Sequence, residues 1–98
     1  MKHFLVELTY IVEIAKIDEV ITEHRAFLQI GYDKNILLMS GPKNPREGGV
    51  IIARGESVEA LQEFFSNDPY SINKCAEYKF TEFMPVKHQE FLKDWING

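Results

Sequence analysis

Cysteine and clustered positive charge are scarce in this sequence, which has one Cys and a formal net charge of −4 at pH 7. Cys75 alone cannot form an internal disulfide or a thiolate metal site, and we expect a half-buried small residue there. The eleven Lys and Arg residues are scattered. Because a protein that binds nucleic acid needs a basic face, we expect no nucleic-acid partner. The three histidines show no short metal-binding spacing, so we expect no metal ion.

Long apolar runs are absent as well. No stretch approaches the about 18 residues that a membrane-spanning helix needs, and Glu7 follows the N-terminus too soon for the core of a signal peptide. We therefore expect no membrane partner and a location in the cytoplasm. The composition, 45% hydrophobic and 27% charged, is that of ordinary globular proteins. At this length we expect one domain, residues 1–98, with a single core.

Hydrophobic periodicity predicts four strands. Apolar residues alternate with other residues over 2–9 and 76–84, as is typical of strands with one face toward a core. Two shorter apolar runs, 36–40 and 50–54, flank a segment rich in glycine and proline and predict a hairpin with a long loop. Such a loop borders a binding site in some proteins and is a flexible tip in others, and the pattern leaves both open.

Three segments predict helices. Residues 16–33 carry apolar side chains at spacings of three and four, and His24 falls in the middle of this stripe. Ser57 is a candidate N-cap for a second helix that ends before Pro69, and residues 70–75 read as a helical turn or an irregular stretch. Residues 88–96 predict a short amphipathic helix near the C-terminus.

The order of these elements is βαββαβ followed by a terminal helix. This order predicts a ferredoxin-like α+β fold, an antiparallel sheet with helices on one face. The first and third strands are central in that topology, and both have apolar residues on both faces, such as Leu5 and Val6. Because helices cover only one face, we expect a homodimer or higher homo-oligomer to cover the other, unless the terminal helix covers part of it.

His24 and Asp68 are the candidate catalytic residues. A histidine exchanges a proton near neutral pH, and a nearby carboxylate orients its ring and stabilises the charged form. A structural role is equally open for each residue. Asp68 could accept backbone hydrogen bonds in its turn, and His24 could be a core residue with both ring nitrogens satisfied.

Several motifs, by their order and spacing, are similar to those of one known family. They are His24 in the first helix, residues 38–42 before the Gly48-Gly49 turn, residues 68–70 after the second helix, and residues 76–78 and 81–88. Together they resemble the YCII-related family over nearly the full length. The resemblance implies a fold of the dimeric α+β barrel type, with an active site built on a histidine and an aspartate. His24 and Asp68 match those positions, and Ser40 matches a small polar residue before Gly-Pro. The same resemblance makes Gly41, Pro42 and Tyr70 substrate-binding candidates.

The resemblance also implies a reaction type, namely proton abstraction followed by loss of a leaving group, such as removal of HCl from a chlorinated hydroxyquinol without a cofactor. His24 would be the base or acid, Asp68 would hold its tautomer, and Ser40 or a loop N–H would stabilise oxyanion charge. The alternative is a non-catalytic dimer that binds a small molecule in the same cleft as a sensor or accessory subunit. Lys87 and His88 could attract an anionic substrate, although a solvated helix start is the simpler explanation.

Overall fold

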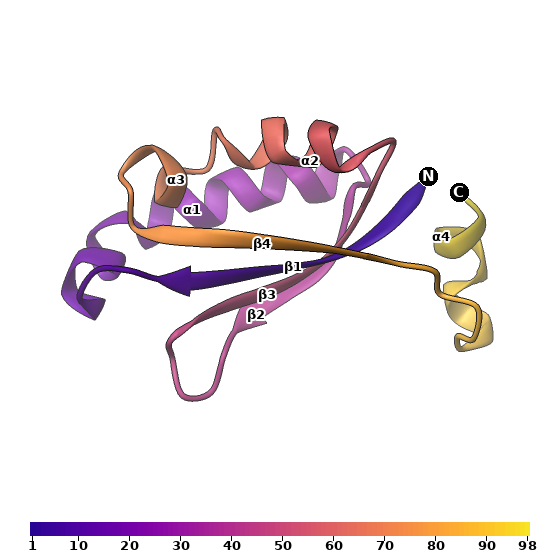
Figure 1. The fold of residues 1–98 in the computed structure, drawn as a ribbon, viewed down its shortest axis with the longest axis horizontal. Helices are drawn as coiled ribbons and strands as arrows, with labels where there is room; N and C mark the ends of the chain where they lie inside the picture. Colours follow the sequence, from indigo (N-terminus) through magenta and orange to yellow (C-terminus); the bar gives the residue numbers. More distant parts are fainter.

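Four strands form one antiparallel sheet in the order β2-β3-β1-β4 in the computed structural model, which describes residues 1–98. The strands are β1 (Lys2–Tyr10), β2 (Leu37–Pro42), β3 (Gly48–Gly55) and β4 (Ala76–Phe83). The helices are α1 (Ile14–Asp33), α2 (Val58–Phe65), α3 (Pro69–Ile72) and α4 (Lys93–Asn97), with a 3₁₀ turn η1 (Glu90–Leu92) before α4. Figure 1 shows α1, α2 and α3 on one face of the sheet. The predicted ferredoxin-like α+β fold is therefore confirmed, with β1 and β3 in the centre.

Alternation along β1 decides which of its side chains enter the core. Phe4, Val6 and Leu8 are at most 2% exposed. Val6 pairs across the strands with Ile51, which is equally buried, because paired residues in an antiparallel sheet point to the same face. Cys75, expected to be half-buried, is fully enclosed in this core.

The long helix α1 carries the predicted apolar stripe. It begins at Ile14, two positions before the predicted start, because the backbone carbonyl of Glu13 accepts hydrogen bonds from the N–H groups of Lys16 and Ile17. The buried residues of the helix are Ile17, Val20, Phe27, Leu28 and Gly31. His24 lies among them on the same face and is half-buried. None of the helices, α1 included, combines the length and apolar character that crossing a membrane requires.

The segment after α2 forms a second short helix, α3. Ser57 caps α2, since its Oγ accepts a hydrogen bond from the N–H of Ala60 at 3.1 Å. Asp68 caps α3 in the same way, and Pro69 occupies the first turn, where a missing N–H costs no helical hydrogen bond. Residues 70–75 thus begin as a helical turn, one of the two structures that the sequence allowed.

The loop of the β2–β3 hairpin folds back toward the end of β1. The carbonyl oxygen of Glu47 accepts a hydrogen bond from the N–H of Tyr10 at 2.9 Å. The strands approach so closely here that a Cβ on Gly48 would collide with the carbonyl oxygen of Leu8, so only glycine fits this position. The loop therefore lies next to the start of α1, which follows β1 directly.

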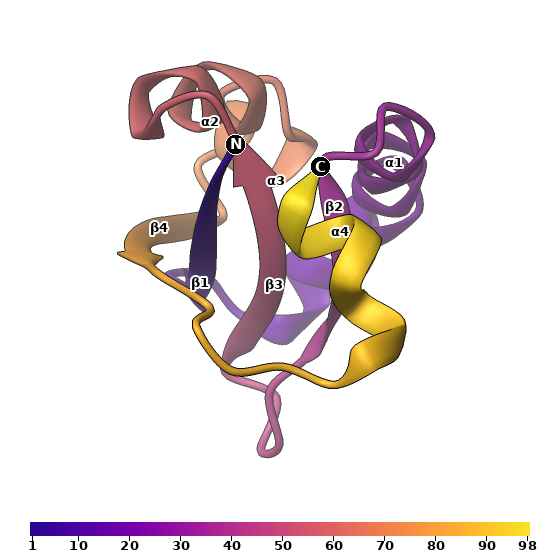
Figure 2. The ribbon, with the colours of Figure 1, turned by 90° about the vertical axis from the view of Figure 1, so that its right-hand side faces the viewer.

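The C-terminal segment packs against one end of the sheet (Figure 2). His3 and Arg54 pair across β1 and β3 and alternate with core residues, so they point to the face without helices. The guanidinium of Arg54 lies 4.0 Å from the Trp95 ring centroid and donates a hydrogen bond to the Trp95 carbonyl. A ring nitrogen of His3 lies 3.2 Å from the carbonyl oxygen of Ile96. The tail, helical from residue 90 rather than 88, covers part of the second face.

Candidate active site

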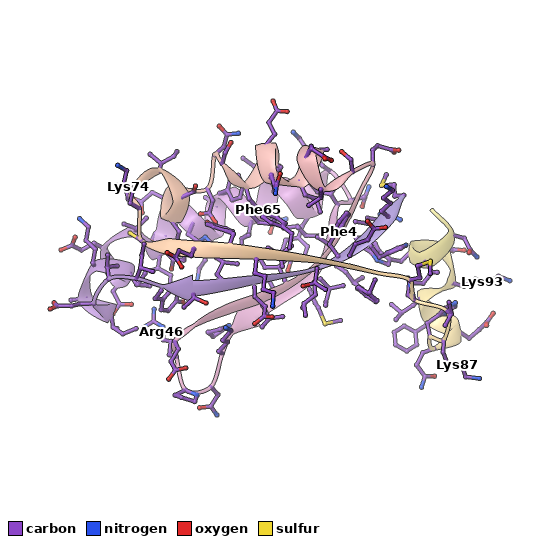
Figure 3. All side chains as sticks on the ribbon, viewed as in Figure 1. Phe4, Arg46, Phe65, Lys74, Lys87 and Lys93 are labelled. Atoms are coloured by element: carbon purple, nitrogen blue, oxygen red, sulfur yellow. The ribbon has the colours of Figure 1, made fainter.

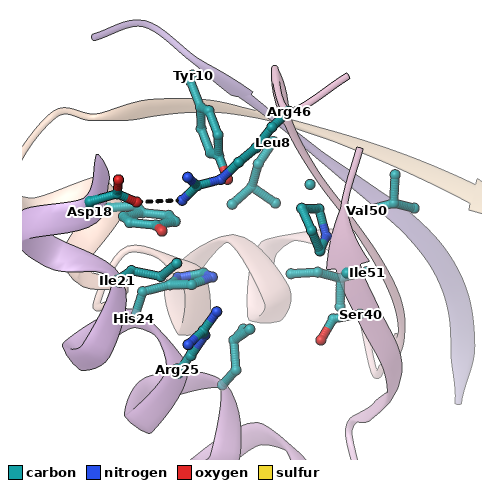
Figure 4. A pocket seen from close by; sticks show the side chains of 15 residues that line it. Leu8, Tyr10, Asp18, Ile21, His24, Arg25, Ser40, Arg46, Val50 and Ile51 are labelled. Carbon is teal, nitrogen blue, oxygen red and sulfur yellow. Dashed lines mark hydrogen bonds and ion pairs between the residues drawn. The ribbon is translucent and has the colours of Figure 1, made fainter. Parts of the chain in front are cut away.

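A cavity of about 510 Å³ lies between α1, the β2–β3 hairpin and α3 (Figure 4). Residues of β1 and β3 complete its wall. Five predicted site residues line the cavity, namely His24, Ser40, Gly41, Pro42 and Tyr70. Asp68 does not line it, since this residue is fully buried behind His24. Arg46, in the loop between β2 and β3, lines the cavity as well, so the long hairpin loop borders it.

The His24 and Asp68 side chains meet at the wall of the cavity. Nδ1 of His24 lies 2.8 Å from Oδ1 of Asp68, and the histidine side chain is 12% exposed while the carboxylate is 0% exposed. Because a carboxylate only accepts, Nδ1 carries the proton, and Nε2 of the neutral ring has a free lone pair. Nε2 has no hydrogen-bond partner within the protein. Because every buried polar side-chain atom of the structure has such a partner, Nε2 is not buried. Nε2 therefore faces the cavity, where it can take or give a proton.

Three donors hold the Asp68 carboxylate in place. Oδ1 accepts hydrogen bonds from His24 and, at 3.0 Å, from the backbone N–H of Tyr70. Oδ2 accepts a hydrogen bond from the hydroxyl of Tyr78 at 2.6 Å. The carboxylate therefore has a fixed orientation, which in turn fixes the His24 ring.

Tyr78 belongs to the 76–78 motif but was not among the predicted site residues. Burial raises the pKa of its hydroxyl well above the ordinary range, and the charge of Asp68 and the hydrogen bond to it add to this effect. A signal was present in the sequence, because Tyr78 falls on the core-facing side of the alternation in β4, where a hydroxyl requires a partner. The partner itself could not be read from the pattern.

Tyr70 supports the other side of the histidine ring. The two rings stack with centroids 3.9 Å apart and an angle of 12° between their planes. Tyr10 packs edge-on against Tyr70 at 6.0 Å. Tyr70 is 2% exposed, and burial, followed by the neighbouring Tyr10, raises the pKa of its hydroxyl. His24 is thus held by a hydrogen bond at one edge and by an aromatic ring on one face.

Ser40 lines the same cavity but makes no hydrogen bond to His24 or Asp68. Its Oγ lies 2.6 Å from the hydroxyl of Tyr32, which the sequence analysis did not single out. Both side chains are accessible to solvent, so the Ser40 hydroxyl remains available to a ligand. The structure therefore brings Ser40 to the cavity without making it part of the His24–Asp68 pair.

Charged side chains that the sequence analysis missed also line the cavity. Arg46, in the hairpin loop, donates a hydrogen bond to Asp18 in the first turns of α1 at 2.7 Å. This hydrogen bond, the largest contribution, raises the pKa of the Arg46 guanidinium. The ion pair joins the hairpin to α1 across the cavity (Figure 4). Arg25 is the neighbour of His24 in sequence and lines the cavity too.

Lys87 and His88 lie outside the cavity. Both are exposed, and Figure 3 shows Lys87 at the opposite end of the molecule from Arg46. These two residues therefore belong to a solvated segment before the terminal helix, the simpler of the two explanations given by the sequence. No three His, Cys, Asp or Glu side chains come together in a way that could hold a metal ion.

The chain is similar to known proteins in family and in fold. The family model described as the YCII-related domain matches residues 3–84. No curated protein sequence matches the chain. A similar solved structure is 5-chloro-2-hydroxyhydroquinone dehydrochlorinase (TftG) from Burkholderia phenoliruptrix AC1100, in complex with 2,5-dihydroxybenzoquinone. Its TM-score is 0.72 at 18% sequence identity, over 91% of this chain and 97% of that one. This similarity shows a shared fold, the ferredoxin-like α+β fold.

Proposed function

This chain belongs to the YCII-related domain family, and from that premise we propose that it is a small-molecule enzyme of the lyase or isomerase type. His24 is its general base and acid, and Asp68 positions the histidine ring. The observation that carries the proposal is the 2.8 Å hydrogen bond between the two side chains, with Nε2 of His24 directed at a cavity. A cavity of about 510 Å³ has the size of a small-molecule site. We expect the activity in the cytoplasm, as predicted from the sequence.

The proposed reaction is dehydrochlorination of a hydroxyquinol-like aromatic compound. Nε2 of His24 takes a proton from one ring hydroxyl and delivers it to the chlorine-bearing carbon. Nε2 of His24, free again after this transfer, takes the proton of a second ring hydroxyl while chloride departs with the electron pair of the C–Cl bond. A hydroxyquinone remains, and the histidine releases the proton to solvent. One proton and one chloride ion leave in total, so the reaction needs no oxidant and no cofactor.

The surroundings of His24 suit both proton transfers. When the ring is protonated, its positive charge lies next to the Asp68 carboxylate, which stabilises the imidazolium. The hydrogen bond at Nδ1 and the stacked Tyr70 ring keep Nε2 in one direction throughout. We assign to Ser40, which lines the same cavity, the role of donating a hydrogen bond to developing oxyanion charge.

Chloride release from 5-chloro-2-hydroxyhydroquinone under anaerobic conditions tests this function. We expect the wild-type protein to release chloride and His24→Gln to be slower by about 10²- to 10⁴-fold, because glutamine cannot exchange the proton. His88→Gln is the matched control, since it makes the same change at an exposed histidine outside the cavity. If the wild-type protein binds such compounds and releases no chloride, the function is ligand binding as a sensor or accessory subunit.

We further propose that the protein forms a homodimer through the sheet face that carries no helices. The support is the apolar character of that face beyond the reach of the tail. Leu5 pairs across the strands with Ile52, and both side chains are half-exposed. Val50 lies further along β3 on the same face, and is also half-exposed. A second copy of the chain would bury these side chains.

A further inference from the structure

Arg25 is a cation without a partner at the edge of the cavity. It takes part in none of the four ion pairs of the structure and is exposed. The residues three and four positions away along α1 are Ile21, Thr22, Leu28 and Gln29, and none of them is a carboxylate that could pair with it. Figure 4 shows the Arg25 side chain below the His24 ring, and both residues line the cavity.

The other arginine of the cavity is in a different state. Arg46 is paired with Asp18 at 2.7 Å, so its charge is already balanced by a carboxylate. His24 is likewise paired with Asp68. Arg25 is therefore the one cation lining the cavity that has no carboxylate beside it.

Apolar side chains line much of the cavity that Arg25 borders. Ile21 and Leu28 come from α1, and Leu8 and Ile51 come from the sheet. Aliphatic walls of this kind suit the faces of a flat ring, while a single guanidinium at the edge suits one oxygen-bearing, negatively charged substituent. The guanidinium is a planar fork that can donate two hydrogen bonds to a carboxylate, or fewer to a phenolate.

We propose that Arg25 is a specificity residue that binds one oxyanion of a planar ring compound, a phenolate or a carboxylate, while the ring lies within reach of Nε2 of His24. This inference rests on the proposed function of the cavity and names the charge and shape of its substrate. Arg25 also lies where it can stabilise the phenolate that forms when His24 removes a proton from a ring hydroxyl.

A pair of probes with the same shape tests the inference by calorimetry. 2,5-Dihydroxybenzoate carries a carboxylate, and 2,5-dihydroxybenzamide replaces it with a neutral amide. We expect wild-type protein to bind the benzoate about 10- to 100-fold more tightly, the factor typical of a hydrogen bond to a charged group. Arg25→Gln should abolish this preference, and Arg25→Lys should retain part of it because the charge remains and the fork is lost.

Lys34→Gln is the control for general electrostatics, because Lys34 is exposed at the C-terminal end of α1 and does not line the cavity. This variant should keep the preference for the benzoate. The inference is wrong if wild-type protein does not prefer the anion, or if Arg25→Gln and Lys34→Gln change the preference equally.

A phenol that changes colour on ionisation tests whether the site also binds a phenolate, the second oxyanion named in the proposal. 4-Nitrophenol absorbs visible light only when it is ionised, so its spectrum reports which form is bound. Wild-type protein should shift the bound compound toward the phenolate, and Arg25→Gln should reduce that shift. No shift with either protein would restrict the site to carboxylates and contradict the role of Arg25 in stabilising a phenolate.

His24→Gln separates this inference from the proposed function. The variant should lose chloride release and keep the preference for the benzoate over the benzamide, because Arg25 is intact. If Arg25→Gln loses the preference for the benzoate while the wild-type protein releases no chloride, the anion site is supported and the proposed catalytic function is wrong. If chloride release depends on His24 while Arg25→Gln binds both probes as the wild-type protein does, the proposed catalytic function is supported and the anion site is wrong.

Discussion

Asp68 Oδ1 accepts a hydrogen bond from His24 in α1 and another from the backbone N–H of Tyr70 in α3. A single carboxylate therefore caps one helix and orients a side chain that projects from another, 44 positions away in the sequence. The sequence suggested two alternative roles for Asp68, a turn residue or a partner of His24, and the structure shows both at once. In the structure the turn holds the carboxylate where the histidine needs it.

Asp68→Asn should reduce both stability and activity. The amide oxygen can still accept from Tyr70, but the amide nitrogen cannot accept the proton of Tyr78. We expect the free energy of unfolding to fall by about 1–3 kcal/mol, the cost of an unsatisfied buried polar group, as measured by urea denaturation. Asp33→Asn, a change at an exposed aspartate, should stay within about 0.5 kcal/mol of wild type. Equal stability of the two variants would contradict the role of the carboxylate.

Tyr78→Phe should weaken the fold and the positioning of Asp68. The substitution removes the 2.6 Å hydrogen bond to Oδ2 and leaves that oxygen buried without a donor, at a cost of about 1–3 kcal/mol. Tyr32→Phe is the matched control, because it removes the hydrogen bond to Ser40 at a position open to solvent, and water can replace it. Chemical denaturation of both variants measures the difference. A smaller effect at Tyr78 than at Tyr32 would show that Tyr78 does not hold the carboxylate.

Stability should fall at alkaline pH because of Tyr70 and Tyr78. Burial raises the pKa of both hydroxyls above the ordinary value of 10.0, and at Tyr78 the charge of Asp68 adds to this. The unfolded chain loses these protons near pH 10 while the folded chain keeps them, so the unfolded state binds fewer protons and unfolding becomes easier as pH rises. The stabilisation that the two raised pKa values provide is complete below pH 10. Above pH 10 the free energy of unfolding declines by up to about 1.4 kcal/mol per pH unit for each tyrosine.

Denaturation curves from about pH 9 to pH 11 measure this decline around the unfolded-state tyrosine pKa. Tyr78→Phe should make the decline shallower, since one of the two groups no longer titrates. A slope that is unchanged in the variant would rule out Tyr78 as its source.

The homodimer predicts a mass of twice 11.4 kDa in sedimentation. Ile52→Glu should convert it to monomers, because Ile52 is half-exposed on the face without helices and a buried carboxylate without a partner is costly. Lys34→Glu is the control, because Lys34 is exposed at the C-terminal end of α1, on the side of the sheet that carries the helices. Wild-type protein that sediments as a stable monomer of 11.4 kDa contradicts the proposed dimer.

The sequence alone determined the fold and the core of this protein. The alternation along β1 and the stripe along α1 are local patterns with periods of 2 and 3.6 residues, and each states which side chains face inward wherever the element packs. The order of the elements then leaves few arrangements of the sheet. His24 could be recognised as special because it interrupts an apolar stripe, and Asp68 because it precedes a proline at the end of a helix.

Only the tertiary structure decided which polar side chains meet. Tyr78 reaches Asp68 from β4, and Arg46 reaches Asp18 from the hairpin loop. Arg25 is the unpaired cation of the cavity, whereas His24 and Arg46 are paired with Asp68 and Asp18. Such partnerships depend on distances between elements far apart in the chain, and no local periodicity encodes these distances. The fold was therefore readable from the pattern of apolar residues, whereas the chemistry of the cavity required the packed structure.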